Sequence, residues 1–389
     1  MDVAGMDVLR LVTQHNRYRG GCLNLIASEN IISRAVLKAL ATDLASRYAF
    51  RPEFYGGTRY ANMIWDECEA LAREVFKAEY CTVAPLSGHL ALMIALATVV
   101  PKGDEVACIP TSEAGYPGMA SDKLPEALGL RVFDLPYHCH SIDVGSAVKL
   151  ISEKRPAAVV LGASLILYPH PIRELAEATH RYGGRIIYDG SHVMGLIAGG
   201  QFQDPLDEGA DILLGSTHKS FFGPQGGLIA TNDGGIAREL ERNIFHKFVD
   251  NIHLNRVAAL AVALEEMRRY ARDYAKRVVS NAKALAVSLD AEGLGVFKSD
   301  RGYTESHQVY IPMGPMEGAA ARDKLERSRI IVDMAVRLGT GEVSRRGMSA
   351  AEMRVIARFI ARGMSGEDVT SEVARLVAKF RRLRYALEA

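Results

Sequence analysis

The chain has few cysteines and no pattern that would pair them. Its 389 residues contain five cysteines, an odd number, and no CxxC spacing, so neither a disulfide framework nor a zinc site is indicated. They are Cys22, Cys68, Cys81, Cys108 and Cys139. We expect most of them to be unreactive interior thiols in a reducing compartment.

Long apolar runs and an excess of one charge are also missing. The longest apolar stretch, residues 90–101, is well short of the ~20 residues that a membrane helix needs. Residues 1–12 lack the basic region and apolar run of a secretory signal. Because 47 Lys and Arg nearly balance 46 Asp and Glu, no nucleic acid or anionic membrane is indicated as partner. We expect a cytoplasmic protein with a small-molecule substrate.

What the chain does have is an alternation of short β-rich runs with helical patterns. The seven runs are residues 80–84, 105–110, 130–135, 157–162, 185–189, 211–215 and 227–231. This alternation indicates an α/β fold with a mostly parallel sheet between helices. Ligands bind such a sheet beyond the carboxyl ends of its strands. Two amphipathic helices are expected before it, at 33–48 with Ser33 as N-cap and at 63–78.

The pattern changes after residue 234. Long helices follow, above all at 255–289, then strand candidates at 308–312 and 330–338 and two closing helices. This predicts a second, smaller α+β domain. We expect a helical N-terminal arm (1–45), a large α/β domain (46–245) and a small C-terminal domain (246–389).

A lysine follows the strand expected at 211–215. Lys219 stands in the segment 215–220, Gly-Ser-Thr-His-Lys-Ser, and a glycine-rich segment comes after it. Small and hydroxyl residues let a phosphate approach the backbone. A desolvated lysine amine loses its proton readily and forms an imine with an aldehyde cofactor. A lone loop lysine is most often a surface residue, so the neighbours of Lys219 are what favour a catalytic role.

An acid ends a neighbouring strand. Asp189 closes the run 185–189, 30 residues before Lys219, so the two side chains are expected at adjacent strand ends. Enzymes that use pyridoxal 5'-phosphate need a carboxylate against the pyridine nitrogen, which makes the ring an electron sink. His192 either supports this ring or is a buried, hydrogen-bonded histidine, and both interpretations stay open.

The third corner of a cofactor site is Ser87-Gly88, at the start of a helix that follows the strand 80–84. Free amides at a helix start, aided by a hydroxyl, bind phosphate. Alone the motif is weak, because the same residues cap ordinary helices.

These residues, in this order, resemble the serine hydroxymethyltransferase family of fold-type I pyridoxal-phosphate enzymes. The matching motifs are Leu25-Ile26-Ala27-Ser28-Glu29-Asn30, Tyr55-Gly56-Gly57-Thr58-Arg59-Tyr60, Ser87-Gly88, the segment 189–195, Thr217-His218-Lys219, Arg337-Leu338-Gly339-Thr340 and Arg345-Arg346-Gly347. The resemblance implies that Lys219 holds the cofactor as a Schiff base and that Asp189 pairs with its ring nitrogen. Ser87, Gly88, Thr217 and His218 would also contact the cofactor.

The resemblance further implies the substrate residues. Arg337 would grip the substrate α-carboxylate through paired hydrogen bonds, with Ser28 and Tyr55 nearby. Tyr55 would reach the partner subunit's cofactor, which makes the expected active form a homodimer with sites at its interface, or a tetramer built from such dimers.

The chain also departs from the family. Where the family has a proton-transferring glutamate, the chain has Phe50, and Glu53 is either a substitute or an exposed loop carboxylate. Tyr116 stands where the family stacks a histidine on the cofactor ring. The long folate-binding loop before Arg337 is missing, and residues 248–253 replace the glycine-rich loop that contacts the partner's phosphate.

We therefore expect an enzyme that makes or breaks the Cα–Cβ bond of a β-hydroxy amino acid, without tetrahydrofolate. The base for the hydroxyl proton stays unassigned among His192, Glu53, Tyr55 and Lys219. The alternatives are the folate-dependent serine–glycine reaction, another reaction on this scaffold such as racemisation, transamination or aldol transfer, and a non-catalytic scaffold that binds the cofactor.

Overall fold

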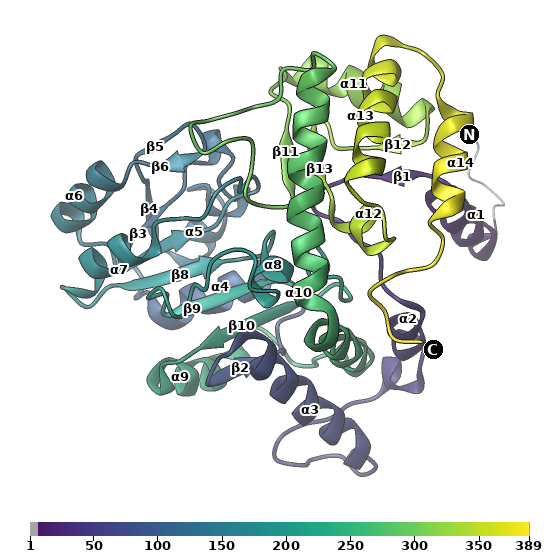
Figure 1. Ribbon diagram of the computed structural model, residues 1–389. Coiled ribbons are helices and arrows are strands. Elements are labelled where there is room, and N and C mark those ends of the chain that lie inside the picture. The colour runs from purple at the N-terminus through teal and green to yellow at the C-terminus, as the bar shows by residue number, and fades with distance from the viewer. Residues whose placement is uncertain (1–6, 389) are drawn as a thin grey trace. The chain divides into compact units, whose positions relative to one another are not determined.

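The computed structural model describes residues 7–388, which form two compact units (Figure 1). The large unit comprises residues 30–276 and those from 385 on, and the small unit comprises 277–384 and those up to 29. Residues 1–6 and 389 lie outside the described residues. The first six belong to the segment 1–12, which lacks the pattern of a secretory signal. The division at residues 45 and 245 remains a proposal. No helix within 7–388 is long and apolar enough to cross a membrane.

A seven-stranded sheet organises the large unit. Its strands are β2 (Tyr80–Thr82), β3 (Glu105–Cys108), β4 (Arg131–Asp134), β7 (Ala158–Leu161), β8 (Arg185–Asp189), β9 (Ile212–Ser216) and β10 (Gly227–Thr231). They are ordered β2-β10-β9-β8-β7-β3-β4. Strand β10 runs opposite to the other six strands of this sheet. Each β-rich run of the sequence overlaps one of these strands, so the expected mostly parallel sheet is confirmed.

The central strands are buried on both faces, which is why they are nearly continuous runs of apolar residues. Every residue of β7, β9 and β10 is buried. Helix α4 (Gly88–Val99) packs against β8, β9 and β10, and α7 (Ile172–His180) packs against β8 and α6 (Val144–Lys154). The other helices of this unit are α2 (Arg34–Leu40), α3 (Arg59–Phe76), α5 (Leu124–Leu128), α8 (Met194–Ala198) and α9 (Gly234–Ile244).

The first helices differ from expectation. The hydroxyl of Ser33 accepts a hydrogen bond from the Val36 amide at 3.1 Å, which confirms it as an N-cap. The helix expected over 33–48 is wrong in length, because α2 ends at Leu40 and a 3₁₀ turn (Asp43–Ser46) follows. A helix also precedes it, α1 (Val8–Gly20), and none of its residues is buried.

The small unit has its own apolar core and two short ladders. Strand β1 (Leu23–Asn24) pairs in parallel with β12 (Ile330–Ile331), and β11 (Gln308–Tyr310) pairs antiparallel with β13 (Arg337–Gly339). The helices are α11 (Pro315–Arg327), α12 (Gly341–Arg345), α13 (Ala350–Ser365) and α14 (Thr370–Lys379). Helix α10 (Leu254–Ala291) begins in the large unit and ends in the small one.

The single strand expected over 330–338 is wrong. A turn separates β12 from β13, and Val336 has a φ of 49°. Asp333 closes this turn: its carbonyl accepts from the Val336 amide and its carboxylate from the Arg337 amide, both at 3.1 Å. A side chain that bonds the backbone a few residues on competes with strand pairing, which the apolar pattern does not reveal.

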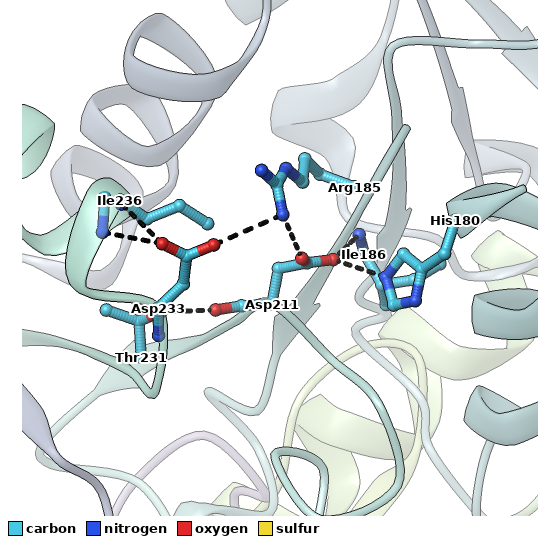
Figure 2. Close-up of polar contacts among 8 residues, drawn as sticks. His180, Arg185, Ile186, Asp211, Thr231, Asp233 and Ile236 are labelled. Carbon is cyan, nitrogen blue, oxygen red and sulfur yellow. Dashed lines mark hydrogen bonds and ion pairs between the residues drawn. The ribbon is translucent and has the colours of Figure 1, made fainter. Parts of the chain in front are cut away.

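A polar network ties together the edge of the sheet opposite the carboxyl ends (Figure 2). The buried carboxylate of Asp211 accepts from the Ile186 amide at 2.7 Å and from Arg185 at 2.8 Å, and lies 2.9 Å from His180 Nε2. Arg185 also approaches Asp233 at 3.4 Å, and Asp233 caps the first turn of α9. The network joins the starts of β8 and β9 to the end of β10.

Replacing Asp211 with alanine is expected to lower the free energy of unfolding by about 1–3 kcal/mol, because it leaves the buried Ile186 amide without its acceptor and removes the partner of the more exposed Arg185 and His180. The matched control is Asp207→Ala, which removes an exposed ion pair with Arg173 and should cost less than about 1 kcal/mol. Urea unfolding of both variants measures the difference. Equal losses would show that the network does not stabilise the sheet.

Candidate functional site

A buried carboxylate marks the carboxyl edge of the sheet. Asp189 ends β8, is 6% exposed, and accepts a hydrogen bond from the Ser191 amide at 2.9 Å. A Cβ on Gly162, just past β7, would lie 2.7 Å from the Asp189 Cβ, so that glycine leaves room for the acid. Burial raises the pKa of Asp189, while the positive charge of Lys219 and the bonds from Ser191 act in the opposite direction. A carboxylate in this position attracts a cation.

The first turn of α4 lies against the ends of β8 and β9. Ser87 caps the helix by accepting from the Leu90 amide at 3.1 Å. A Cβ on Gly88 would lie 2.3 Å from the Ser216 hydroxyl and 3.0 Å from that of Ser191, so only glycine allows this approach. Hydroxyls and helix-start amides together form a cradle of the kind that binds phosphate.

The loop that carries Lys219 is fixed at several points. The Thr217 hydroxyl donates to the Pro224 carbonyl at 2.6 Å, and Asn30 donates to the Lys219 carbonyl at 2.9 Å. His218 Nδ1 is buried and finds no hydrogen-bond partner within residues 7–388. Burial, with the nearby charge of Lys219, lowers the pKa of His218 to about 4, so its ring is neutral at pH 7.

Sequence reasoning missed Arg256, in the first turn of α10. Its Nη2 donates to the carbonyl of Val83, just past β2, at 2.7 Å, and to that of Ile252 at 2.9 Å. Its Nε and Nη1 are buried with no hydrogen-bond partner among the described residues, and burial lowers the pKa of Arg256 to about 10. Nη1 lies 2.9 Å from where a Cβ on Gly226 would stand. The only sequence signal is its place just after 248–253, the segment that replaces a phosphate loop.

A second missed residue is His89, which directly follows Gly88. Its Nδ1 lies 2.8 Å from the hydroxyl of Tyr116, and the two rings meet edge to face at 63°. Burial raises the pKa of Tyr116, and the negative charge of Asp189 adds to the rise. The charge of His89 in turn acts to lower the pKa of Asp189, so the pair and the acid are electrostatic neighbours.

The other predicted residues of the large unit differ in their exposure to solvent. His192 is 5% exposed in the turn between β8 and α8. Tyr55 is 43% exposed and packs against Tyr48 and Phe54, so its reach to a partner's cofactor stays a prediction. Glu53 is exposed and accepts from Asn62 at 3.1 Å.

Ser28 and Arg337 belong to the small unit, so their part in this site stays a prediction. Ser28 is half-buried in the loop after β1. Arg337 begins β13, and its Nε and Nη2 donate to one carboxylate oxygen of Asp333 at 3.1 and 2.9 Å. The guanidinium is therefore already oriented by an acid of its own turn.

The carboxyl edge of the large unit fits pyridoxal phosphate. The α4 cradle suits its phosphate, and the buried Asp189 suits its protonated ring nitrogen. The Nε and Nη1 atoms of Arg256 and the Nδ1 atom of His218, which have no hydrogen-bond partner among the described residues, add polar groups. A lysine stands one strand away from the acid. Sheet, lysine, acid and cradle together define the fold-type I class of pyridoxal-phosphate enzymes.

The chain belongs to the serine hydroxymethyltransferase family. The family model of that description matches residues 1–360. Serine hydroxymethyltransferase from Methanopyrus kandleri is 41% identical and that from Pyrobaculum neutrophilum 40%, each over 97% of this chain and 92% of the relative. The predicted family and cofactor are confirmed, and the chain is a pyridoxal-phosphate-dependent enzyme of the transferase and aldolase type.

The structure is also similar to that of L-threonine transaldolase from Pseudomonas fluorescens in its internal aldimine state. The TM-score is 0.89 with 27% identity, and the match covers 97% of this chain and 92% of that one. This similarity confirms the predicted fold class.

Gly88→Ala is expected to raise the dissociation constant for pyridoxal phosphate at least about tenfold, equivalent to about 1.4 kcal/mol, because its Cβ would push α4 away from Ser216. Gly145→Ala is the matched control, since Gly145 also lies in the first turn of a helix and a Cβ there would meet nothing closer than 3.8 Å. Titrating the cofactor into the cofactor-free proteins measures both constants. An unchanged constant in Gly88→Ala would contradict the role of the cradle.

Proposed function

We propose that this enzyme makes and breaks the Cα–Cβ bond of β-hydroxy amino acids, yielding glycine and an aldehyde or transferring the glycine unit to another aldehyde, without tetrahydrofolate. The observation that carries the proposal is the buried Asp189, held at the carboxyl edge of the sheet within the electrostatic reach of Lys219. The family membership and the similarity to a threonine transaldolase agree with it.

Each residue of the edge has a proposed task. The Lys219 amine would hold the cofactor covalently, and Asp189 would keep its ring nitrogen protonated. Ser87, Gly88 and Thr217 hold the phosphate, while the neutral His218 and the buried His192 line the cofactor. When bound, the cofactor supplies an electron sink for the pair of the cleaved bond.

The short turn before Arg337 supports independence from folate. Only the five residues 332–336 join β12 to β13, and Asp333 closes them into a tight turn. The position of the family's glutamate holds Phe50, whose ring packs on Phe245 and His246 with centroids 5.6 and 5.5 Å away. The phenyl ring of Phe50 has no acidic proton, so it cannot transfer one in folate chemistry.

The remaining expectations are part of the same proposal. Arg337 binds the substrate carboxylate with Ser28 nearby, and two subunits form a cytoplasmic homodimer, or a tetramer of dimers, in which Tyr55 reaches the partner's site. The exposed rings of Tyr55 and Phe54, 43% and 79% accessible, suit such an interface.

The folate-dependent serine–glycine reaction is the second candidate. It is favoured by relatives about 40% identical that carry the name serine hydroxymethyltransferase. Rearranged loops would then have to hold the folate.

The purified enzyme is expected to release acetaldehyde from L-threonine or L-allo-threonine without folate, because the cleavage needs an electron sink and a base for the hydroxyl proton but no folate. A coupled aldehyde assay measures the rate, and Lys219→Ala should abolish it. Reduction with borohydride should place a pyridoxyl group on Lys219 in a mass spectrum. Formation of methylenetetrahydrofolate from serine, with no cleavage of either threonine, would favour the second candidate.

Arg337→Lys should raise KM for the amino acid about 10- to 100-fold with a smaller effect on kcat, because lysine cannot give the paired hydrogen bonds of a guanidinium. Arg322→Lys serves as control, since Arg322 is a surface residue that pairs with Asp323. Steady-state kinetics on threonine separate the two constants. A KM unchanged in Arg337→Lys would exclude this arginine as the carboxylate site.

A further inference from the structure

We propose that Tyr116 and His89 form the acid–base pair that takes the proton of the substrate hydroxyl, in place of the glutamate that the family has at position 50. This inference rests on the proposed function and deepens it, because it names the proton acceptor that the cleavage needs.

Both side chains are fixed by the carboxyl edge of the sheet. His89 sits in the first turn of α4, which the Ser87 cap and the contact of Gly88 with Ser216 hold in place. The Tyr116 amide donates to the carbonyl of Gly162 at 3.3 Å. A Cβ on Gly118 would lie 2.4 Å from the Tyr116 ring, so that glycine makes room for the ring.

The pair lies on the side of the sheet where the cofactor is expected. Gly162 binds the backbone of Tyr116 and also abuts the side chain of Asp189, so the tyrosine and the acid flank one residue. The hydroxyl of Tyr116 lies 2.8 Å from His89 Nδ1, and His89 is exposed whereas Tyr116 is half-buried. The pair is therefore both ordered and accessible to a substrate.

The protonation states suit a relay. Burial raises the pKa of Tyr116, so its phenol keeps its proton at neutral pH, within hydrogen-bond distance of His89 Nδ1. A phenol oxygen can accept one proton while it gives up another. Imidazole is the side-chain base that changes charge nearest neutral pH. The negative charge of Asp189 acts on Tyr116, and the positive charge of Lys219 acts on Asp189.

The other candidates fit less well. His192 is 5% exposed, and Glu53 lies on the surface with its carboxylate bonded to Asn62. Tyr55 packs against other exposed aromatic rings. Tyr116, in contrast, has His89 Nδ1 2.8 Å from its hydroxyl, so a second group is positioned to store the proton.

In the cleavage, one proton moves from the substrate hydroxyl through Tyr116 to His89. The substrate O–H bond breaks and its proton goes to the Tyr116 oxygen, while the phenolic proton goes to His89 Nδ1 and leaves an imidazolium. The O–H electron pair becomes the second bond of the aldehyde C=O. When bound, the cofactor would supply the sink for the Cα–Cβ electron pair, and a proton added at Cα would give glycine. The imidazolium loses its extra proton to solvent, which restores the starting state.

Two variants of the holoenzyme test the pair. Tyr116→Phe removes the hydroxyl, and His89→Asn keeps an acceptor near the Nδ1 position but cannot store a proton at neutral pH. We expect each to slow aldehyde release from a β-hydroxy amino acid by about 100-fold or more, the range of general acid–base catalysis. Exchange of the glycine α-protons with deuterated solvent, which involves no hydroxyl, should change by less than about threefold.

The outcomes separate the inference from the proposed function. If wild-type protein shows neither cleavage nor exchange, the proposed function fails. If wild-type cleaves and His89→Asn cleaves equally fast, His89 only positions Tyr116 and the inference is overturned. An equal loss of cleavage and exchange would also overturn it, because that pattern reports damage to the cofactor site.

A measurement on the cofactor-free protein tests the hydrogen bond without any turnover. The imidazole ¹H–¹⁵N spectrum of His89 should show the tautomer with its proton on Nε2, because Nδ1 accepts from Tyr116. Tyr116→Phe should shift the His89 Nδ1 signal and leave that of the exposed His180 unchanged. An unaltered His89 signal would show that the two side chains do not interact in solution.

Discussion

The buried carboxylate of Asp189 is the constraint on which the rest of the site depends. An isolated buried charge is strongly destabilising unless donors or a cation compensate for the lost water. The Ser191 amide, the charge of Lys219 and the neighbouring His89 each act to lower its raised pKa. A protonated ring nitrogen would complete this compensation, so the acid both requires the cofactor and holds it in the electron-accepting form.

The sheet was predictable because its strands obey a local rule. Strands buried on both faces must be short apolar runs, and β8 and β10 have the bounds that the sequence predicts. The errors come from side chains that act across a turn or an edge. Asp333 breaks the expected strand 330–338 by bonding the amide of Arg337, and β1 has only two residues and exists through its pairing with β12. Hydrophobic periodicity contains neither kind of information.

The site likewise contains residues that local sequence patterns predict and residues that they do not. Ser87, Asp189 and Lys219 could be proposed because each follows a strand, where a parallel sheet collects ligand-binding residues. His89 and Tyr116 are 27 residues apart, and their hydrogen bond depends on how α4 and the loop after β3 meet above the sheet. Arg256 is buried only because α10 begins beside the carbonyl of Val83. Such encounters between distant segments follow from the three-dimensional fold and have no local signature.

The cofactor and the proton acceptor are separable parts of this chemistry. The electron sink needs only Lys219 and Asp189 around the ring, whereas the choice of bond and substrate depends on groups above it. A chain can therefore lose the glutamate and the folate loop of its family and still cleave the same bond, provided that another base stands within reach of the hydroxyl. In this chain His89 comes from the same helix turn that forms the phosphate cradle, so binding the cofactor and positioning the base share one structural element. A Cβ at Gly88 would displace the whole turn and is expected to alter affinity and catalysis together, whereas replacing the His89 side chain alone is expected to slow the cleavage and leave the cradle in place.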